Sequence, residues 1–186
     1  MKDARCLAEL LNKGIRVRYA LKSFRLEGRP YKQGSLIITK ADNKLKPDFI
    51  PVFKRLVEKH TNSINAASTG FVDDGKDFGS GYVRMIPRVK VGVVMGDPTS
   101  TLRYGEIWHF MEQQLGYPFA ALDAEYLKGV DLNKYDVLIM PGGYGYRDLV
   151  DENFLKKLKS WVASGGRLIA MGGAIRSIGG DEGFNI

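Results

Sequence analysis

The chain has 186 residues, of which 44% are hydrophobic, and a formal net charge of +7. This length and composition predict a globular protein with one large or two small domains around an apolar core. The sequence contains no run of 18 apolar residues, and its first residues lack a signal-peptide pattern, so we expect neither a membrane span nor an export signal in this chain. The single cysteine, Cys6, has no partner for an internal disulfide, and we expect it to pack on a helix.

The charge is divided unevenly along the sequence. Residues 1–88 hold 18 Lys and Arg against 9 Asp and Glu, a net charge of +9, whereas residues 89–186 hold 10 against 12, a net charge of −2. We therefore expect a basic N-terminal α/β half, 1–88, and a separate α/β domain, 89–186. A basic half suits nucleic acid or another acidic partner. Several of its cations alternate with apolar residues, which is typical of the solvent face of a strand, so we expect no nucleic-acid partner: Arg16, Arg18, Lys22, Arg25 and Arg29.

Two helices are predicted in the N-terminal half. Leucines at helical spacing indicate a helix over 4–14 that ends at Gly14. A second helix is predicted over 47–60, with five apolar residues on one face: Phe49, Ile50, Phe53, Leu56 and Val57.

Strands and loops make up the rest of that half. Alternating residues predict a half-exposed strand over 15–24, followed by a turn over 27–34 and a short buried strand over 35–39. Residues 64–68 are a candidate strand. Residues 69–81 combine Gly, Asp and Ser without periodicity and predict a long loop, and loops of this length often carry function.

The second half shows a clearer alternation of apolar strands with helices. The predicted strands are 89–96, 118–124, 135–145 and 167–173, and the predicted helices are 104–116 and 151–166. In the first helix we expect four side chains to face inward: Ile107, Phe110, Met111 and Leu115. Strands that are apolar throughout predict a parallel, doubly wound sheet, so the expected fold class is three-layer α/β/α.

Three loops follow these strands and are predicted to meet at the carboxyl edge of the sheet, where ligands of such folds bind. They are GDPTST (96–101), PGGYG (141–145) and GGAIRS (172–177), and the candidate cleft residues are Asp97, Thr99, Ser100, Glu106, Gly142, Gly143, Tyr144, Gly172, Gly173 and Ala174. The two glycines after Pro141 suit either an anion-binding nest or a plain turn. The hydroxyl groups after Asp97 suit a helix cap, or the phosphate loop of a flavin or nucleotide site.

A strand YDVLIMPGG, then a helix, then GGRLIAMGGA resembles the class I glutamine amidotransferase-like fold, including its ThiJ/PfpI branch, over residues 89–180. The resemblance implies a flavodoxin-like sheet, an oxyanion hole at the PGG loop and a cysteine nucleophile at the next strand-to-helix elbow. It aligns the nucleophile with Gly173, within one residue. It also implies an acidic residue near Glu106.

The sequence departs from that family where the chemistry takes place. Residues 171–175 are Met, Gly, Gly, Ala and Ile, and none of these side chains can attack a carbonyl carbon. The family's histidine follows the elbow, whereas the two histidines here, His60 and His109, precede it. We therefore expect no amidotransferase reaction and no catalytic residue in this chain.

The whole chain also resembles the region after the catalytic domain of large bacterial zinc carboxypeptidase-like proteins, in which an amidotransferase-like module is appended. This resemblance rests on ARCLAELLNKGIRVRYA, GFVDDGKDFGSGYVRMIPRVKVGVVMGD and GGAIRSIGGDEGFN. It implies a fragment whose fold is incomplete at the C-terminus, from a periplasmic or secreted parent. Any zinc is expected only in the parent's peptidase domain, because the two histidines here are 49 positions apart, without HExxH or HxxE.

These observations predict a non-catalytic accessory domain that gives structural support or recognises a substrate or partner. The expected partners are the rest of the parent polypeptide, a peptide or small anionic ligand, and a second copy of the chain, because an incomplete sheet exposes an edge strand. The competing hypotheses are a ThiJ/PfpI-like hydrolase and a flavin- or nucleotide-binding protein. No cofactor is expected in this chain.

Overall fold

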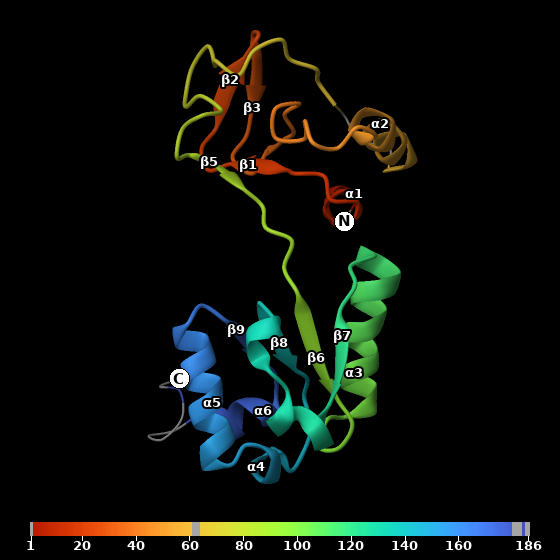
Figure 1. Cartoon of the computed structure of the whole chain (residues 1–186), viewed down its shortest axis with the longest axis vertical. Coiled ribbons are helices and arrows are strands. Elements are labelled where there is room, and N and C mark those ends of the chain that lie inside the picture. Colours follow the sequence, from red (N-terminus) through yellow and green to blue (C-terminus); the bar gives the residue numbers. More distant parts are fainter. Residues whose placement is uncertain (1, 61–63, 180–183, 185–186) are drawn as a thin grey trace. The chain divides into compact units, whose positions relative to one another are not determined.

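The computed structural model describes residues 2–60, 64–179 and 184 (Figure 1). The chain divides into two compact units, residues 1–88 and 89–186. Each unit has its own buried apolar cluster, so each is described by itself.

Over residues 2–60 and 64–88, the N-terminal unit contains two helices and five very short strands. A three-stranded antiparallel sheet has the order β4-β1-β5, and β2 and β3 form a separate hairpin. The elements are α1 (Lys2–Asn12), β1 (Arg18–Ala20), β2 (Phe24–Leu26), β3 (Arg29–Tyr31), β4 (Leu36–Ile37), α2 (Phe49–His60) and β5 (Val83–Met85).

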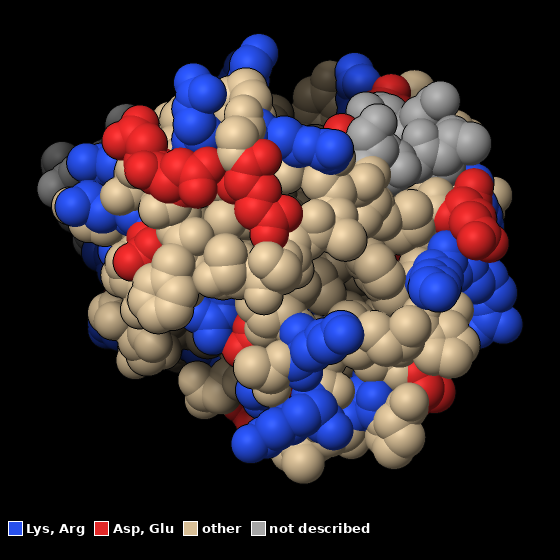
Figure 2. Space-filling model, turned by 90° about the horizontal axis from the view of Figure 1, so that it is seen from above, with Lys and Arg blue, Asp and Glu red and all other residues tan. Residues whose placement is uncertain are grey.

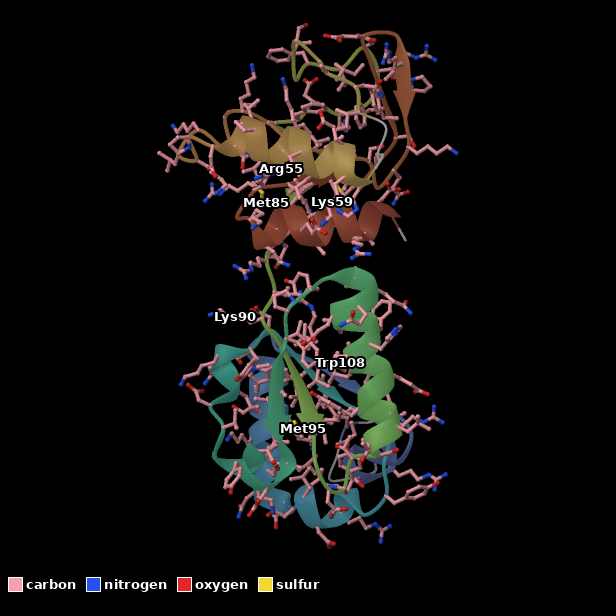
Figure 3. All side chains as sticks on the ribbon, turned by 90° about the vertical axis from the view of Figure 1, so that its right-hand side faces the viewer. Arg55, Lys59, Met85, Lys90, Met95 and Trp108 are labelled. Carbon is pink, nitrogen blue, oxygen red and sulfur yellow. The ribbon has the colours of Figure 1, made fainter. Side chains whose placement is uncertain are left out.

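Both helices predicted in this unit are present, and they pack against each other. Their shared apolar cluster consists of Cys6, Leu10, Leu11, Ile15, Val17, Phe49, Val52 and Leu56. At the edge of this contact, Lys59 of α2 donates hydrogen bonds to Glu9 of α1, and Figure 3 labels Lys59 on the side of α2 toward α1. The predicted apolar face of α2 is partly wrong, because Ile50 is 38% exposed while Val52 is buried.

The predicted strands of this unit are wrong in their bounds. The strand expected over 15–24 is broken into β1 and the start of β2, and the expected turn over 27–34 contains strand β3. The reversal takes place at Glu27 and Gly28, whose φ angles of 50° and 75° allow a tight hairpin turn. The strand expected over 35–39 is reduced to β4, and residues 64–68 form no strand.

The predicted long loop over 69–81 is confirmed as irregular backbone, but it is firmly attached to the hairpin. Asp73 N donates to Arg25 O at 2.8 Å, and Arg25 N donates to Asp74 O at 2.9 Å. Within the loop, Phe78 N donates to Gly70 O at 3.1 Å, so the chain folds back on itself.

The C-terminal unit contains a four-stranded sheet of order β7-β6-β8-β9 in which all neighbouring strands are parallel. This confirms the predicted parallel α/β sheet. The elements are β6 (Val91–Met95), α3 (Thr101–Trp108), η1 (His109–Leu115), β7 (Ala120–Asp123), η2 (Ala124–Gly129), η3 (Leu132–Lys134), β8 (Val137–Met140), α4 (Tyr146–Leu149), α5 (Glu152–Ala163), β9 (Arg167–Ala170) and α6 (Gly173–Ile178).

The main core lies between the sheet and α5. Alternate strand residues Val94, Leu122, Leu138 and Met140 pack in one cluster with Phe154, Leu155, Leu158 and Trp161 of α5. Asp151 caps α5 by accepting a hydrogen bond from Phe154 N at 2.8 Å. Figure 1 shows α3 and α5 on either side of the strands. On the edge strand β9, Ile169 stays 43% exposed.

The predicted helix over 104–116 begins earlier and changes its type. An α-helix, α3, is followed by the π-helical segment η1. A π-helix has more residues per turn than an α-helix, so every later side chain points in a different direction around the helix axis than α-helical spacing predicts. Met111 is buried as predicted and Ile107 and Leu115 are half-buried, but the prediction is wrong for Phe110, which is 43% exposed. Trp108, labelled in Figure 3, lies at the α-to-π junction.

Candidate functional site

The three predicted loops lie together at the carboxyl ends of β6, β8 and β9. Ser100 N donates to Gly142 O at 3.0 Å, and Tyr144 N donates to Pro98 O at 3.2 Å, which joins the first two loops by a short antiparallel bridge. The third loop joins them through glycines, because Gly173 packs directly on the carbonyl group of Gly143. The structure thus brings the predicted loops into contact by their backbones.

Two glycines make this close contact possible. A Cβ atom added to Gly143 would lie 2.0 Å from Pro98 O, and one added to Gly173 would lie 1.9 Å from Gly143 O. Both distances are shorter than any real contact, so these positions admit only glycine. Gly143 is buried against the first loop, so its role here is close backbone packing.

The strand-to-helix elbow is at Gly172. This residue has φ 53° and ψ −121°, and it links β9 to α6. Such a backbone is strained for residues that carry a Cβ, and nucleophile elbows keep a serine on a strained strand-to-helix turn of this kind. A Cβ added to Gly172 would lie 3.5 Å from Gly142 Cα, which is an ordinary contact. The elbow position is therefore one residue before Gly173, and it has room for a side chain that the sequence lacks.

A residue that the sequence analysis missed holds the loops in place. Tyr146 is almost fully buried, and its hydroxyl donates to Pro141 O at 2.7 Å while it accepts from Thr99 Oγ1 at 2.7 Å. Burial raises the pKa of Tyr146, so this phenol is neutral at physiological pH. The available signal was a tyrosine directly after the PGGYG segment, since a buried tyrosine needs a partner for its hydroxyl.

The other polar residues of the site have structural partners or face solvent. Ser100 caps α3. Glu106 is exposed and accepts two hydrogen bonds of 3.0 Å from Arg103. Asp97 is exposed, and Tyr144 at 92% is among the most exposed large side chains of the unit. Gly172 is exposed, whereas Ala174 is buried below it.

Each histidine lies next to a residue outside the three loops. His109 is exposed on η1, with its Nδ1 atom 3.4 Å from Gln114 Nε2. His60 belongs to the N-terminal unit, where its Nε2 atom lies 3.2 Å from Glu9 Oε1. The lone thiol of Cys6 is buried, and burial, followed by the charges of Glu9 and Asp3, raises its pKa.

The donors needed for a catalytic metal are also not assembled in the part of the chain that the structure describes. Among residues 2–60, 64–179 and 184, no three side chains of His, Cys, Asp and Glu come together as a metal site. Over the same residues, no helix has both the length and the apolar composition needed to cross a bilayer.

Surface charge is grouped by sign. On the face drawn in Figure 2, most of the visible Asp and Glu side chains lie in one group, with Lys and Arg spread around it. Arg18 does not stand free on a solvated strand face as predicted, because its guanidinium donates two hydrogen bonds of 2.7 Å to Asp42. Arg16 is exposed between buried Ile15 and Val17, as the alternation predicts.

Comparison of the chain with protein-family models, with curated proteins and with solved structures found no match.

Proposed function

We propose that the chain is a non-catalytic, amidotransferase-like accessory domain of a larger zinc carboxypeptidase-like protein, in which it supports the structure and recognises a partner or substrate. The observation that carries this proposal is the elbow at Gly172. Its backbone angles of 53° and −121° are those of a strained turn that presents a nucleophile, yet the residue is glycine. A fold that keeps the turn without the thiol suits binding rather than bond cleavage.

The proposed architecture is a three-layer flavodoxin-like sheet that is incomplete on one side. The parallel order β7-β6-β8-β9 with helices on both sides supports it. Parallel sheets are normally covered on both faces, but Ile169 on β9, the last strand in the described order, is 43% exposed on the face opposite the main core. In this proposal the side of the sheet at β9 is completed by further parent polypeptide or by a second copy of the chain.

Recognition is proposed to use the exposed rim of the three loops. The glycines at the centre pack backbone on backbone, and the accessible groups of the rim include the Tyr144 ring, the Asp97 carboxylate and the Gly172 backbone. An exposed tyrosine on a loop fixed by buried hydrogen bonds is a typical anchor for a peptide or protein partner. The parent would place this surface in a periplasmic or secreted protein.

The first test asks whether the chain has its own chemistry. We expect the purified chain to be colourless, to hydrolyse neither glutamine nor a nitrophenyl ester, and to remain unlabelled by a fluorophosphonate. Turnover that is lost in Tyr144→Ala would contradict the proposal and favour a ThiJ/PfpI-like hydrolase. A yellow protein that releases flavin on denaturation would favour the flavin-binding hypothesis.

The second test concerns the partner. We expect the longer reading frame to encode an upstream domain with closely spaced His and Glu ligands for zinc. Tyr144→Ala should weaken binding of that separately expressed domain by about 30-fold in calorimetry, the loss typical of an aromatic anchor. Tyr126→Ala is the matched control, because Tyr126 is an exposed tyrosine on η2 of the same unit. Equal affinities of both variants and the unaltered chain would show that the loop rim is not the contact.

A further inference from the structure

The long loop of the N-terminal unit forms an open hollow of about 480 Å³ that the proposed function does not use. This volume lies within the range of small-molecule sites. The hollow is lined by Gly70, Phe71, Asp77, Phe78, Gly79 and Ser80.

The loop around the hollow is fixed by its own hydrogen bonds. Phe78 N donates to Gly70 O across the opening, and Val72 N donates to Asp77 Oδ1 at 2.7 Å. Ser80 N donates to Asp77 O at 2.9 Å, which closes the turn on the far side. A hollow with so many backbone bonds in its wall keeps its shape without a ligand, which lowers the entropy cost of binding.

Two phenyl rings supply the apolar part of the wall. Phe78 is packed edge-on against Phe24, with ring centroids 5.6 Å apart and an interplanar angle of 87°. Phe71 is 77% exposed at the rim. Gly70 and Gly79 complete the wall with backbone alone, so a flat or elongated group can approach closely between the rings.

The polar groups of the wall have unused hydrogen-bonding capacity. Ser80 Oγ is buried and has no hydrogen-bond partner among the residues described. Asp77 uses Oδ1 to accept from Val72 N, and within the described ranges no hydrogen bond or ion pair involves its Oδ2 atom. A carboxylate oxygen and a hydroxyl group both accept hydrogen bonds, so this wall is complementary to a donor.

The charges of the loop favour a cation even though the unit as a whole is basic. Arg18, whose guanidinium donates to Phe78 O at 3.4 Å, is itself paired with Asp42. Residues 69–81 contain Asp73, Asp74 and Asp77 against one cation, Lys76. The Lys76 ammonium lies 5.6 Å from the ring centroid of Tyr82, which does not line the hollow. Aromatic faces beside a carboxylate attract organic cations through the ring quadrupole and the negative charge together.

We propose that this hollow binds an organic cation: an ammonium group carried on an apolar body, held by Asp77 and Ser80, with its apolar part against Phe71 and Phe78. Such a group occurs in a free aromatic amine and in the lysine side chain of a polypeptide. Both present N–H donors to the two unused acceptors and an apolar stem to the two rings.

The experiment titrates benzylamine, its neutral isostere benzyl alcohol and a capped lysine (Nα-acetyl-lysine methylamide) into the ¹⁵N-labelled full chain. We expect saturable shifts of the Gly70, Gly79 and Ser80 amides with benzylamine. Benzyl alcohol should bind about tenfold more weakly, because it lacks a charged donor. In Asp77→Asn, whose amide oxygen can still accept from Val72 N, that tenfold preference should disappear. Stronger binding of the capped lysine identifies a polypeptide ligand, and weaker binding a free amine.

A matched pair of loop variants tests the location. Gly79 lines the hollow whereas Gly81 does not, and a Cβ added at either position meets no atom within 4 Å. Gly79→Leu should therefore abolish the shifts without loss of folding, and Gly81→Leu should leave them unchanged. Equal binding of benzylamine and benzyl alcohol to the unaltered chain, or unimpaired binding to folded Gly79→Leu, would overturn the proposal. Neither outcome bears on the elbow at Gly172.

Discussion

The two units of this protein keep their shapes by different means. In the C-terminal unit, strand β6 has four buried residues in a row, and the sheet packs its alternate residues on α5 in one large apolar cluster. In the N-terminal unit no described strand exceeds three residues, and side chains such as Asn43, Asp42 and Arg18 bond the segments to one another. Apolar burial dominates the stability of the C-terminal unit, whereas specific hydrogen bonds contribute a larger share of the stability of the N-terminal unit.

This difference decides where each unit can bind a ligand. The parallel sheet brings its loops so close together that Gly143 and Gly173 touch neighbouring carbonyl groups, which leaves only an exposed rim. The N-terminal unit, with a long loop fixed by hydrogen bonds, forms an open hollow with unused acceptors. Dense packing of loops favours a surface that contacts a macromolecule, and a loop fixed by hydrogen bonds favours a site for a small ligand.

The largest expected effect comes from removing apolar volume from the C-terminal core. Leu158 of α5 is fully buried in the cluster that joins the helix to the sheet. We expect Leu158→Ala to lower the free energy of unfolding by about 3 kcal/mol in urea titration, through lost burial and the cavity left behind. Leu102→Ala, an exposed leucine of the same unit, should change it by less than about 0.5 kcal/mol. An equal loss of unfolding free energy in both variants would contradict the dominant role of this apolar cluster in the stability of the unit.

The helices and strands of the C-terminal unit were predictable because the sequence patterns that specify them are local and extend over several residues. The strands are continuous apolar runs, and Asp151 and Gly165 mark the two ends of α5. The strands of the N-terminal unit were not predictable, because each has only two or three residues. Such a strand depends on a partner strand far along the chain, as β1 depends on β5. The change from α3 to the π-helical η1 also escaped prediction, since an inserted residue leaves no clear mark on helical spacing.

The strand topology predicted that the three loops meet, but it did not predict whether they form a cleft or pack tightly. Parallel strands place their carboxyl ends at one edge, so Thr99, Gly142 and Gly172 were expected near each other. Whether glycines line a cleft or close it depends on distances of a few tenths of an ångström between backbones. The buried hydroxyl of Tyr146 and the hollow beside Ser80 depend in the same way on tertiary packing, which residue spacing does not record.

An intermediate effect is expected from breaking the hydrogen bonds by which Asn43 joins two segments of the N-terminal unit. Asn43 is buried, accepts from Arg16 N at 2.8 Å and donates to the carbonyl groups of Arg16 and Thr39. Asn43→Ala leaves these backbone groups unpaired, so we expect the free energy of unfolding to fall by about 2 kcal/mol in urea titration. Lys44→Ala, at the exposed neighbouring position, is the control and should have little effect. An unchanged free energy of unfolding in Asn43→Ala would show that apolar burial alone stabilises this unit.

The smallest expected effect depends on pH and involves Asp42. Hydrogen bonds from Arg18, which outweigh the opposing effect of burial, lower the pKa of Asp42. A carboxyl group with a lowered pKa in the folded state contributes stability above its ordinary pKa of about 3.9, and this contribution is lost as pH falls through the folded value. We expect Asp42→Asn to cost about 1 kcal/mol at neutral pH. Below about pH 4 the gap between variant and unaltered chain should narrow, because the unfolded chain takes up a proton at Asp42 before the folded chain does. Thermal unfolding of both proteins at stepwise lower pH measures this gap. A gap that stays constant to the acid limit would mean that the charge of Asp42 contributes nothing to the fold, and the contrast between the two units would then rest on neutral hydrogen bonds alone.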